Sequence, residues 1–347
     1  SDAPKVIRNW DVVRQVDANG NKQVKPCLNH PEFRAWTAGT VEDLFCNYPL
    51  DGIQYGAERS GPIGNLLHFN IRPHCFCEHC TTRAKEKSID AERARVGMNV
   101  LYEYIQSLRA GTQHDSDGAL VGFLRILMQY PEVLAWERQW HIANNEVHQM
   151  IHDTVKKIRP EAEAGRHVAH VEGSMDMFYR AGAPYSEMTD SCDFVKTIMY
   201  HEIAGPRFKM WYIDPLGKTI LKELGDQQSL ELFYAVFGHD AGKQPSLDEL
   251  DERGFSPEYV HRETKRCVDA VGGRARVYSG IGLDIPKGGG WGTEIWGSDP
   301  DYVCQTVKRS FEAGASGIVI SREYEENTTR SLNAVGRAVR ELKAAKA

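Results

Sequence analysis

Short apolar segments alternate with long helical segments over most of this chain. The strand-like segments are residues 50–55, 162–168, 194–200, 277–281 and 317–321. The helix-like segments, with apolar residues three and four positions apart, are residues 91–108, 131–159, 257–271, 299–313 and 329–345. Because strands that alternate with helices form a parallel sheet, this pattern predicts an α/β fold.

Polar and charged side chains gather directly after these five strands. They are Glu58 and Arg59, His167 and His170, Tyr200 and His201, Asp284, and the run from Arg322 to Glu326. In a parallel barrel the active site lies at the C-terminal edge of the strands, whereas an open doubly wound sheet binds ligands at one switch point. Functional groups after every strand favour the barrel. We therefore predict a (β/α)8 barrel of the TIM type, formed as a single domain by residues 1–347.

The number of strands is too small for a complete barrel, which has eight. The segment before residue 50 contains Asp17-Ala-Asn-Gly20, a turn signal between two polar strands, and this predicts a hairpin rather than three strand–helix units. We therefore expect a barrel that is incomplete at the N-terminal end of this chain. An incomplete parallel barrel leaves an open edge, so we expect a homo-oligomer or a partner segment to complete it.

Composition restricts the partners. The net charge of −6 over 347 residues gives no basic surface for nucleic acid or an anionic membrane. No apolar run reaches the roughly 18–20 residues that a membrane span needs. Residues 1–6 lack the regions of a signal peptide, so any export signal is absent or already removed, and the compartment stays open.

A cysteine cluster is the sharpest local motif. Cys75-Phe-Cys77-Glu-His-Cys80 has the spacing with which thiolates converge on one tetrahedral zinc, and the fourth ligand must come from elsewhere. The upstream candidates are Cys27 and Cys46, and the local candidates are His74 and His79. The alternative is a set of unbridged thiols in a loop. Four protein ligands leave no open position, so such a zinc would stabilise structure rather than perform chemistry.

The first 90 residues contain a series of motifs: Asp17-Ala-Asn-Gly20, then Cys27-Leu-Asn-His-Pro31-Glu-Phe33-Arg34, a strand over residues 50–55, Glu58, and the cysteine cluster. In this order the motifs resemble those of the family 42 glycoside hydrolases, a group of β-galactosidases with a barrel fold and a retaining mechanism. The resemblance implies a structural zinc held by Cys27, Cys75, Cys77 and Cys80, within a loop region at 27–80. It also implies that Glu58 is the general acid/base, and that the chain starts after the third barrel strand.

Two departures from the family pattern limit what the resemblance implies. The family has Asn before its acid/base glutamate, whereas this chain has Ala57, so recognition of the sugar 2-hydroxyl must differ. The later strands also lack the sequence context of the family's nucleophile. The second carboxylate is therefore not implied by the resemblance.

Glycoside hydrolysis usually needs two carboxyl groups that flank the scissile bond. Asp284 follows the penultimate strand, within an apolar frame where an unpartnered carboxylate would be costly, and it is the first candidate for the second carboxylate. Glu326 and Glu323, after the last strand, come next. The structural alternatives are a salt bridge for Glu58, a capping role for Asp284 and a solvated surface for the two glutamates.

The remaining candidates would bind substrate. They are Arg59, His167, His170, Tyr200, His201, Trp291 and Arg322, although most histidines and tryptophans serve packing or hydrogen bonding. The sequence thus predicts a glycosidase with a carbohydrate substrate and a retaining mechanism. A first rival is a metal-dependent hydrolase that uses His167, His170 and His201. A second rival is a barrel that binds carbohydrate without cleaving it.

Overall fold

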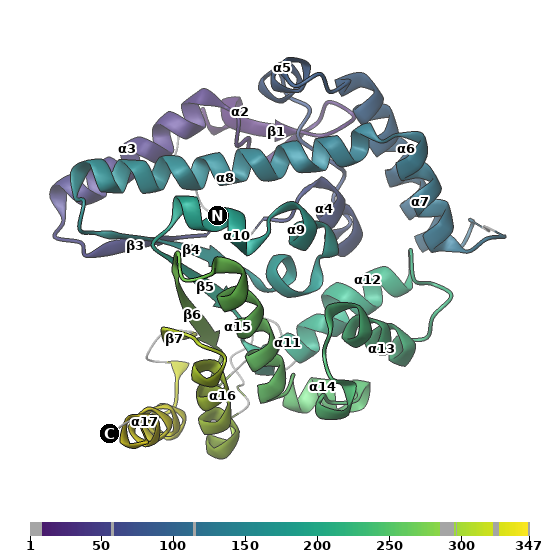
Figure 1. The fold of residues 1–347 in the computed structure, drawn as a ribbon. Coiled ribbons are helices and arrows are strands. Elements are labelled where there is room, and N and C mark those ends of the chain that lie inside the picture. Colours follow the sequence, from purple (N-terminus) through teal and green to yellow (C-terminus); the bar gives the residue numbers. More distant parts are fainter. Residues whose placement is uncertain are drawn as a thin grey trace.

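A curled parallel sheet forms the centre of the computed structural model, which describes residues 9–56, 59–113, 116–284, 295, 297–321 and 326–345 (Figure 1). The sheet has five strands in the order β3-β4-β5-β6-β7. These strands are β3 (Gly52–Tyr55), β4 (Glu163–Val168), β5 (Phe194–Ile198), β6 (Arg276–Ile281) and β7 (Gly317–Ile320). Each strand pairs in parallel with the next strand of the sequence.

The five strands coincide with the five segments that the sequence predicts, to within two residues at each end. This confirms the parallel α/β class. The described residues form half of a barrel, in which β3 and β7 are the edge strands. They do not form a closed ring of eight strands.

The five predicted helices are also present. They are α6 (Ala91–Arg109), α8 (Glu132–Ile158), α15 (Pro257–Val271), α16 (Pro300–Glu312) and α17 (Thr329–Ala344). Their first residues follow from capping, because the side chains of Asp90, Ser256, Asp299 and Thr328 accept hydrogen bonds from the first turns of α6, α15, α16 and α17.

The N-terminal region contains the predicted hairpin and one long helix that the sequence did not reveal. Strands β1 (Arg14–Val16) and β2 (Lys22–Pro26) are antiparallel, after the short helix α2 (Trp10–Val13). Helix α3 (Pro31–Asn47) follows and packs against α8. Its buried residues, Phe33, Thr37, Val41 and Phe45, form a single stripe. This stripe is narrower than the apolar face by which a surface helix is predicted from sequence, so α3 was not predicted.

The other helices lie in the connections between strands. Three precede α8 in the chain: α4 (Pro62–Phe69), α5 (Glu78–Glu86) and α7 (Ala119–Gln129). After β4 come α9 (Met177–Gly182) and α10 (Tyr185–Met188). After β5 come α11 (His201–Phe208), α12 (Asp214–Gly217), α13 (Asp226–Phe237) and α14 (Leu247–Arg253). In the described part of the chain, no helix is long and apolar enough to cross a membrane.

The two faces of the sheet differ in chemistry. Ala164, Val168, Val195 and Val277 belong to the apolar cluster that α3 and α8 also supply. On the opposite, concave face, His167 of β4 pairs in register with Lys196 of β5. The alternation of strand side chains thus places a polar layer inside the half-barrel, near the C-terminal ends of the strands.

Candidate active site

A lysine, a tyrosine and a histidine meet on the concave face where β4 and β5 end. The buried Lys196 donates a hydrogen bond to the hydroxyl of Tyr200 at 2.5 Å, and its Nζ lies 3.4 Å from Nδ1 of His167. The side-chain nitrogen of Gln54, on β3, lies 3.2 Å from the same Nδ1. A Cβ atom at Gly56 would lie 2.7 Å from the His167 ring, so only glycine fits beside it without displacement. Lys196 therefore connects two predicted residues, His167 and Tyr200. Lys196 itself was not predicted from the sequence.

The two other predicted histidines are engaged elsewhere. Nε2 of His170 lies 2.8 Å from the carbonyl oxygen of Met199, and its ring packs against Tyr200. His201 is fully buried at the start of α11, where its Nε2 lies 3.0 Å from Oγ1 of Thr306 on α16. Burial lowers the pKa of both histidines to about 3, so both are neutral near pH 7. His201 thus belongs to a helix interface, whereas His170 borders the polar layer.

Asp284, at the end of β6, is fully buried and well supplied with donors. Its Oδ1 accepts hydrogen bonds from the Ser298 amide at 3.1 Å and the Ser331 hydroxyl at 2.9 Å. Its Oδ2 accepts one from the Thr328 amide at 2.7 Å. The carboxylate therefore links the end of β6 to the beginning of α17.

Backbone strain marks the same edge of the sheet. Tyr200 and Asp284 have φ angles of 32° and 48°, in the left-handed region that non-glycine residues rarely adopt. Each stands directly after a strand, β5 or β6. Such outliers persist only where the surrounding structure enforces them, and they concentrate at functional sites.

Two buried glutamates at this edge were not predicted from the sequence. Glu172 follows β4, and its Oε1 accepts a hydrogen bond from Ser60 at 3.2 Å. Glu202 follows β5, and its Oε2 accepts one from Ser298 at 2.7 Å. Burial raises the pKa of each glutamate to about 7. A carboxyl group of this kind can hold a proton near neutral pH and act as a general acid.

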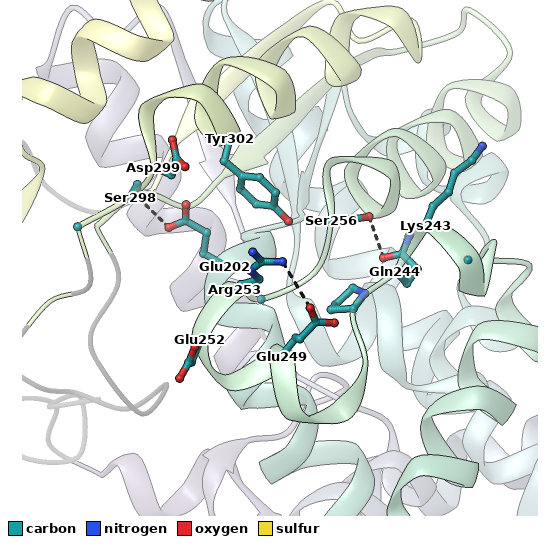
Figure 2. A pocket seen from close by; sticks show the side chains of 14 residues that line it. Glu202, Lys243, Gln244, Glu249, Glu252, Arg253, Ser256, Ser298, Asp299 and Tyr302 are labelled. Atoms are coloured by element: carbon teal, nitrogen blue, oxygen red, sulfur yellow. Dashed lines mark hydrogen bonds and ion pairs between the residues drawn. The ribbon is translucent and has the colours of Figure 1, made fainter.

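Glu202 opens into a cavity of about 570 Å³ beside α11, α14 and the start of α16 (Figure 2). Other residues of its wall are Gln244, Arg253, Ser256 and Tyr302. The cavity is large enough for a small polar ligand. The sequence carries no local signal for it, because its wall combines segments that are up to about a hundred residues apart.

Arg59 lines a second cavity, which lies between the hairpin, α3 and β3. Its Nη1 donates to the carbonyl oxygen of Pro26 at 3.1 Å, and burial lowers its pKa. This groove is also about 570 Å³ and is mostly aromatic and aliphatic. Its residues include Trp10, Phe33, Trp36 and Tyr55.

Four predicted site residues, Glu58, Trp291, Arg322 and Glu323, lie outside the described residues. Their predicted roles stay predictions. Glu326 is described and half-buried, between β7 and α17.

The four cysteines that the resemblance selects do converge. Among the described residues, Cys27, Cys75, Cys77 and Cys80 form a group whose sulfur atoms all lie within 4.8 Å of one another. Sγ of Cys27 lies 3.5 Å from that of Cys80 and 3.4 Å from that of Cys77. Cys46 is exposed on α3 and takes no part.

The surroundings of the cluster suit thiolate ligands. The amide of Val16 donates to Sγ of Cys75 and that of Asn29 to Sγ of Cys27, each at 3.3 Å. The Asn29 side chain donates to Sγ of Cys80 at 3.3 Å. Such donors stabilise negative charge on sulfur, and four thiolates this close need a cation between them. The donor set therefore fits a tetrahedral structural metal.

Comparison with known proteins supports the fold. No family model and no curated protein sequence matches this chain. Among solved structures, it is similar to the polyextremophilic β-galactosidase of the Antarctic haloarchaeon Halorubrum lacusprofundi, with a TM-score of 0.54 and 12% identity over 97% of the chain. It is also similar to the β-galactosidase of the psychrophilic Marinomonas ef1, with a TM-score of 0.52 and 8% identity over 96%.

The chain spans less than half, 47%, of each of these two galactosidases. At such low identity the likeness establishes a shared fold, a curled parallel sheet with helices, and no more. It does not transfer a substrate or a catalytic residue to this chain.

Proposed function

We propose that this chain is a glycoside hydrolase whose reaction takes place at the C-terminal edge of the half-barrel. The observation that carries the proposal is the presence of buried carboxyl groups with raised pKa at the edge where barrel enzymes hold their active sites. The fold shared with two β-galactosidases supports it. The family 42 motifs around Glu58 support it independently.

In this proposal Glu58 is the general acid/base. It follows β3 in the sequence, between Gly56, which adjoins His167, and Ser60, which donates to Glu172. A proton donor protonates the leaving glycosidic oxygen, while a second carboxylate attacks the anomeric carbon or activates water. The proposed mechanism retains the anomeric configuration, as the resemblance implies.

The experiment is Glu58→Gln, assayed with an aryl glycoside that has a good leaving group and with an alkyl glycoside. Positioned proton transfer contributes roughly 10²–10⁴-fold, so the alkyl glycoside should lose about that factor in kcat/KM. The aryl glycoside needs little protonation and should lose much less. Equal, small losses on both substrates would show that Glu58 is structural.

Asp284 is the proposed second carboxylate, with Glu326 and Glu323 as the next candidates. The three donors around Asp284 bond to both oxygens of its carboxyl group and fix its orientation at the end of β6. The same donors also hold α17, so loss of activity in Asp284→Gly would not prove catalysis. Rescue of that variant by azide, with a glycosyl azide as the product, would identify a nucleophile.

The two rival functions make different demands on the structure. In the described part of the chain, His167, His170 and His201 do not form a metal-ligand group with one another or with an acid, which disfavours a metal-dependent hydrolase. A barrel that only binds carbohydrate would bind sugars yet turn over no substrate in a broad panel of aryl glycosides. That panel separates binding from hydrolysis.

We also propose that Cys27, Cys75, Cys77 and Cys80 hold a structural zinc ion. The four sulfur atoms are the donors that zinc prefers, and their mutual distances suit bonds of about 2.3 Å to one ion. The metal would join the end of the hairpin, through Cys27, to the start of α5, through Cys77 and Cys80. It would leave no coordination position for a substrate.

A further inference from the structure

The cavity beside α11 has a buried acid at its base. Glu202 is only 8% exposed, and its Oε2 accepts the one hydrogen bond from Ser298. The described residues give Oε1 no hydrogen-bond donor. Ser298 is itself fixed, because its hydroxyl accepts a hydrogen bond from the amide of Asp284 at 2.8 Å. Glu202 thus presents one oxygen to the cavity on a rigid support (Figure 2).

Carboxyl groups outnumber cationic side chains in the wall of this cavity. Four carboxyl groups, those of Glu202, Glu249, Glu252 and Asp299, face two cationic side chains. Both cations have acidic partners, since Arg253 lies 3.4 Å from Glu249 and Lys243 lies 3.5 Å from Asp240. The carboxyl groups of Glu202, Glu252 and Asp299 have no ion pair with a described lysine or arginine. The cavity therefore favours a cationic ligand.

Neutral polar groups line the side of the cavity away from Glu202. Ser256 donates its hydroxyl to Oε1 of Gln244 at 3.0 Å, which leaves the amide nitrogen of Gln244 as a donor. The ring of Tyr302 and the ring of Pro245 add apolar surface. Hydroxyl partners combined with a ring surface suit a small hydroxylated molecule, and the volume of about 570 Å³ admits a monosaccharide.

We propose that this cavity binds an amino sugar, with its ammonium group against Glu202 and its hydroxyl groups against Gln244 and Ser256. The carbohydrate part of this inference rests on the proposed glycoside hydrolase function. The preference for a free amine rests on the cavity alone. The inference thus names the class of sugar that the protein recognises.

The test is calorimetric titration of the whole chain with four probes. Glucosamine carries both an ammonium group and hydroxyl groups, whereas glucose has the hydroxyls only, ethanolamine lacks the sugar ring, and N-acetylglucosamine has its amine neutralised. A charge-assisted hydrogen bond in a buried site is expected to make glucosamine bind on the order of tenfold more tightly than the other three.

Three variants locate the binding. Glu202→Gln keeps an oxygen acceptor for Ser298 but can no longer become a carboxylate opposite an ammonium group, and it should abolish the preference for glucosamine. Glu252→Gln, at an exposed position of the same wall, should weaken the preference without any risk to folding. Asp248→Asn removes the same charge from an exposed position of α14 outside the cavity wall, and it should change nothing.

Several results would overturn the inference. Glucosamine that binds no more tightly than glucose, or no binding of any probe, excludes the ammonium site. A preference that survives both Glu202→Gln and Glu252→Gln places the site elsewhere. Ethanolamine that binds as tightly as glucosamine excludes the sugar. If the chain hydrolyses neutral glycosides but shows no preference for glucosamine, only this inference fails. If glucosamine binds as expected but no glycoside is hydrolysed, only the proposed function fails.

Discussion

The most informative residues at the strand ends are those whose burial conflicts with their charge. Glu172 and Glu202 are buried carboxylic acids, and each accepts a hydrogen bond from a serine hydroxyl. Lys196 is buried, and its Nζ contacts the hydroxyl of Tyr200 and Nδ1 of His167. Burial without a full set of partners costs free energy, so such groups indicate an active site more strongly than their sequence positions do.

Glu172 makes a prediction about pH. Its pKa is raised from 4.5 to about 7 in the folded protein by burial, so between these pH values the folded state holds a proton that the unfolded chain has released. The stability contributed by this proton is fully present below pH 4.5 and is lost as pH rises to 7, by roughly 3 kcal/mol. Glu172→Gln removes this loss. The variant should therefore gain stability relative to the wild type between pH 5 and pH 8 in urea unfolding.

The control for this experiment is Glu231→Gln, at an exposed position of α13. The difference in free energy of unfolding between Glu231→Gln and the wild type should be the same at every pH. If plots of unfolding free energy against pH for Glu172→Gln and the wild type stay parallel from pH 5 to pH 8, then Glu172 is ionised throughout. The raised pKa of Glu172 would then be wrong.

Asp284 joins the beginning of one element, α17, to the end of β6. Asp284→Asn leaves one acceptor oxygen for three donors, and its NH₂ group would face a donor such as the amide of Thr328. An unsatisfied buried donor costs about 1–3 kcal/mol. Thermal unfolding should therefore show a clear loss of stability in Asp284→Asn. Ser331→Ala removes the two hydrogen bonds of the Ser331 hydroxyl, to Asp284 and from Thr328, but it turns no donor toward another donor, so it should lose less stability. An Asp284→Asn variant of unchanged stability would contradict this role of Asp284.

The cysteine cluster joins a second set of elements, the hairpin and α5. Removal of the metal by a chelator, or Cys27→Ser, should lower the unfolding temperature, because a structural metal contributes its binding energy to folding. Cys46→Ser is the matched control, since Cys46 is exposed on α3. Elemental analysis that finds no metal in the purified chain would rule out the site.

The sequence revealed those elements whose local pattern agrees with their final environment. The strands and the capped helices α6, α15, α16 and α17 carry both periodicity and start signals, so they were predicted nearly to the residue. Residues 201–255 were not, because Pro206 and Pro215 lie inside or at the start of short helices that tertiary packing stabilises. Glu202 was missed because the residue that marks its environment, Ser298, is 96 positions away in the sequence.

At the scale of the whole molecule, the half-barrel leaves one side of β3 without a partner strand among the described residues. The groove next to this edge is lined by Trp10, Phe33, Trp36, Ile53 and Tyr55. Trp36 is 46% exposed, and Val24 of the same groove is 66% exposed. An unpaired strand edge beside an exposed apolar groove is a surface that another chain or segment can cover.

We therefore expect the purified chain to self-associate through this groove. Light scattering coupled to gel filtration should show a mass that rises with concentration, because the edge of β3 and the aromatic groove are then buried together. Val24→Lys and Trp36→Lys should each shift the equilibrium toward monomer. Met128→Lys is the matched control, since Met128 is 82% exposed on α7, away from β3, and its loss should have no effect. A chain that stays monomeric at every concentration, or one for which only Met128→Lys dissociates the assembly, would show that the open side of the half-barrel is not a self-association surface.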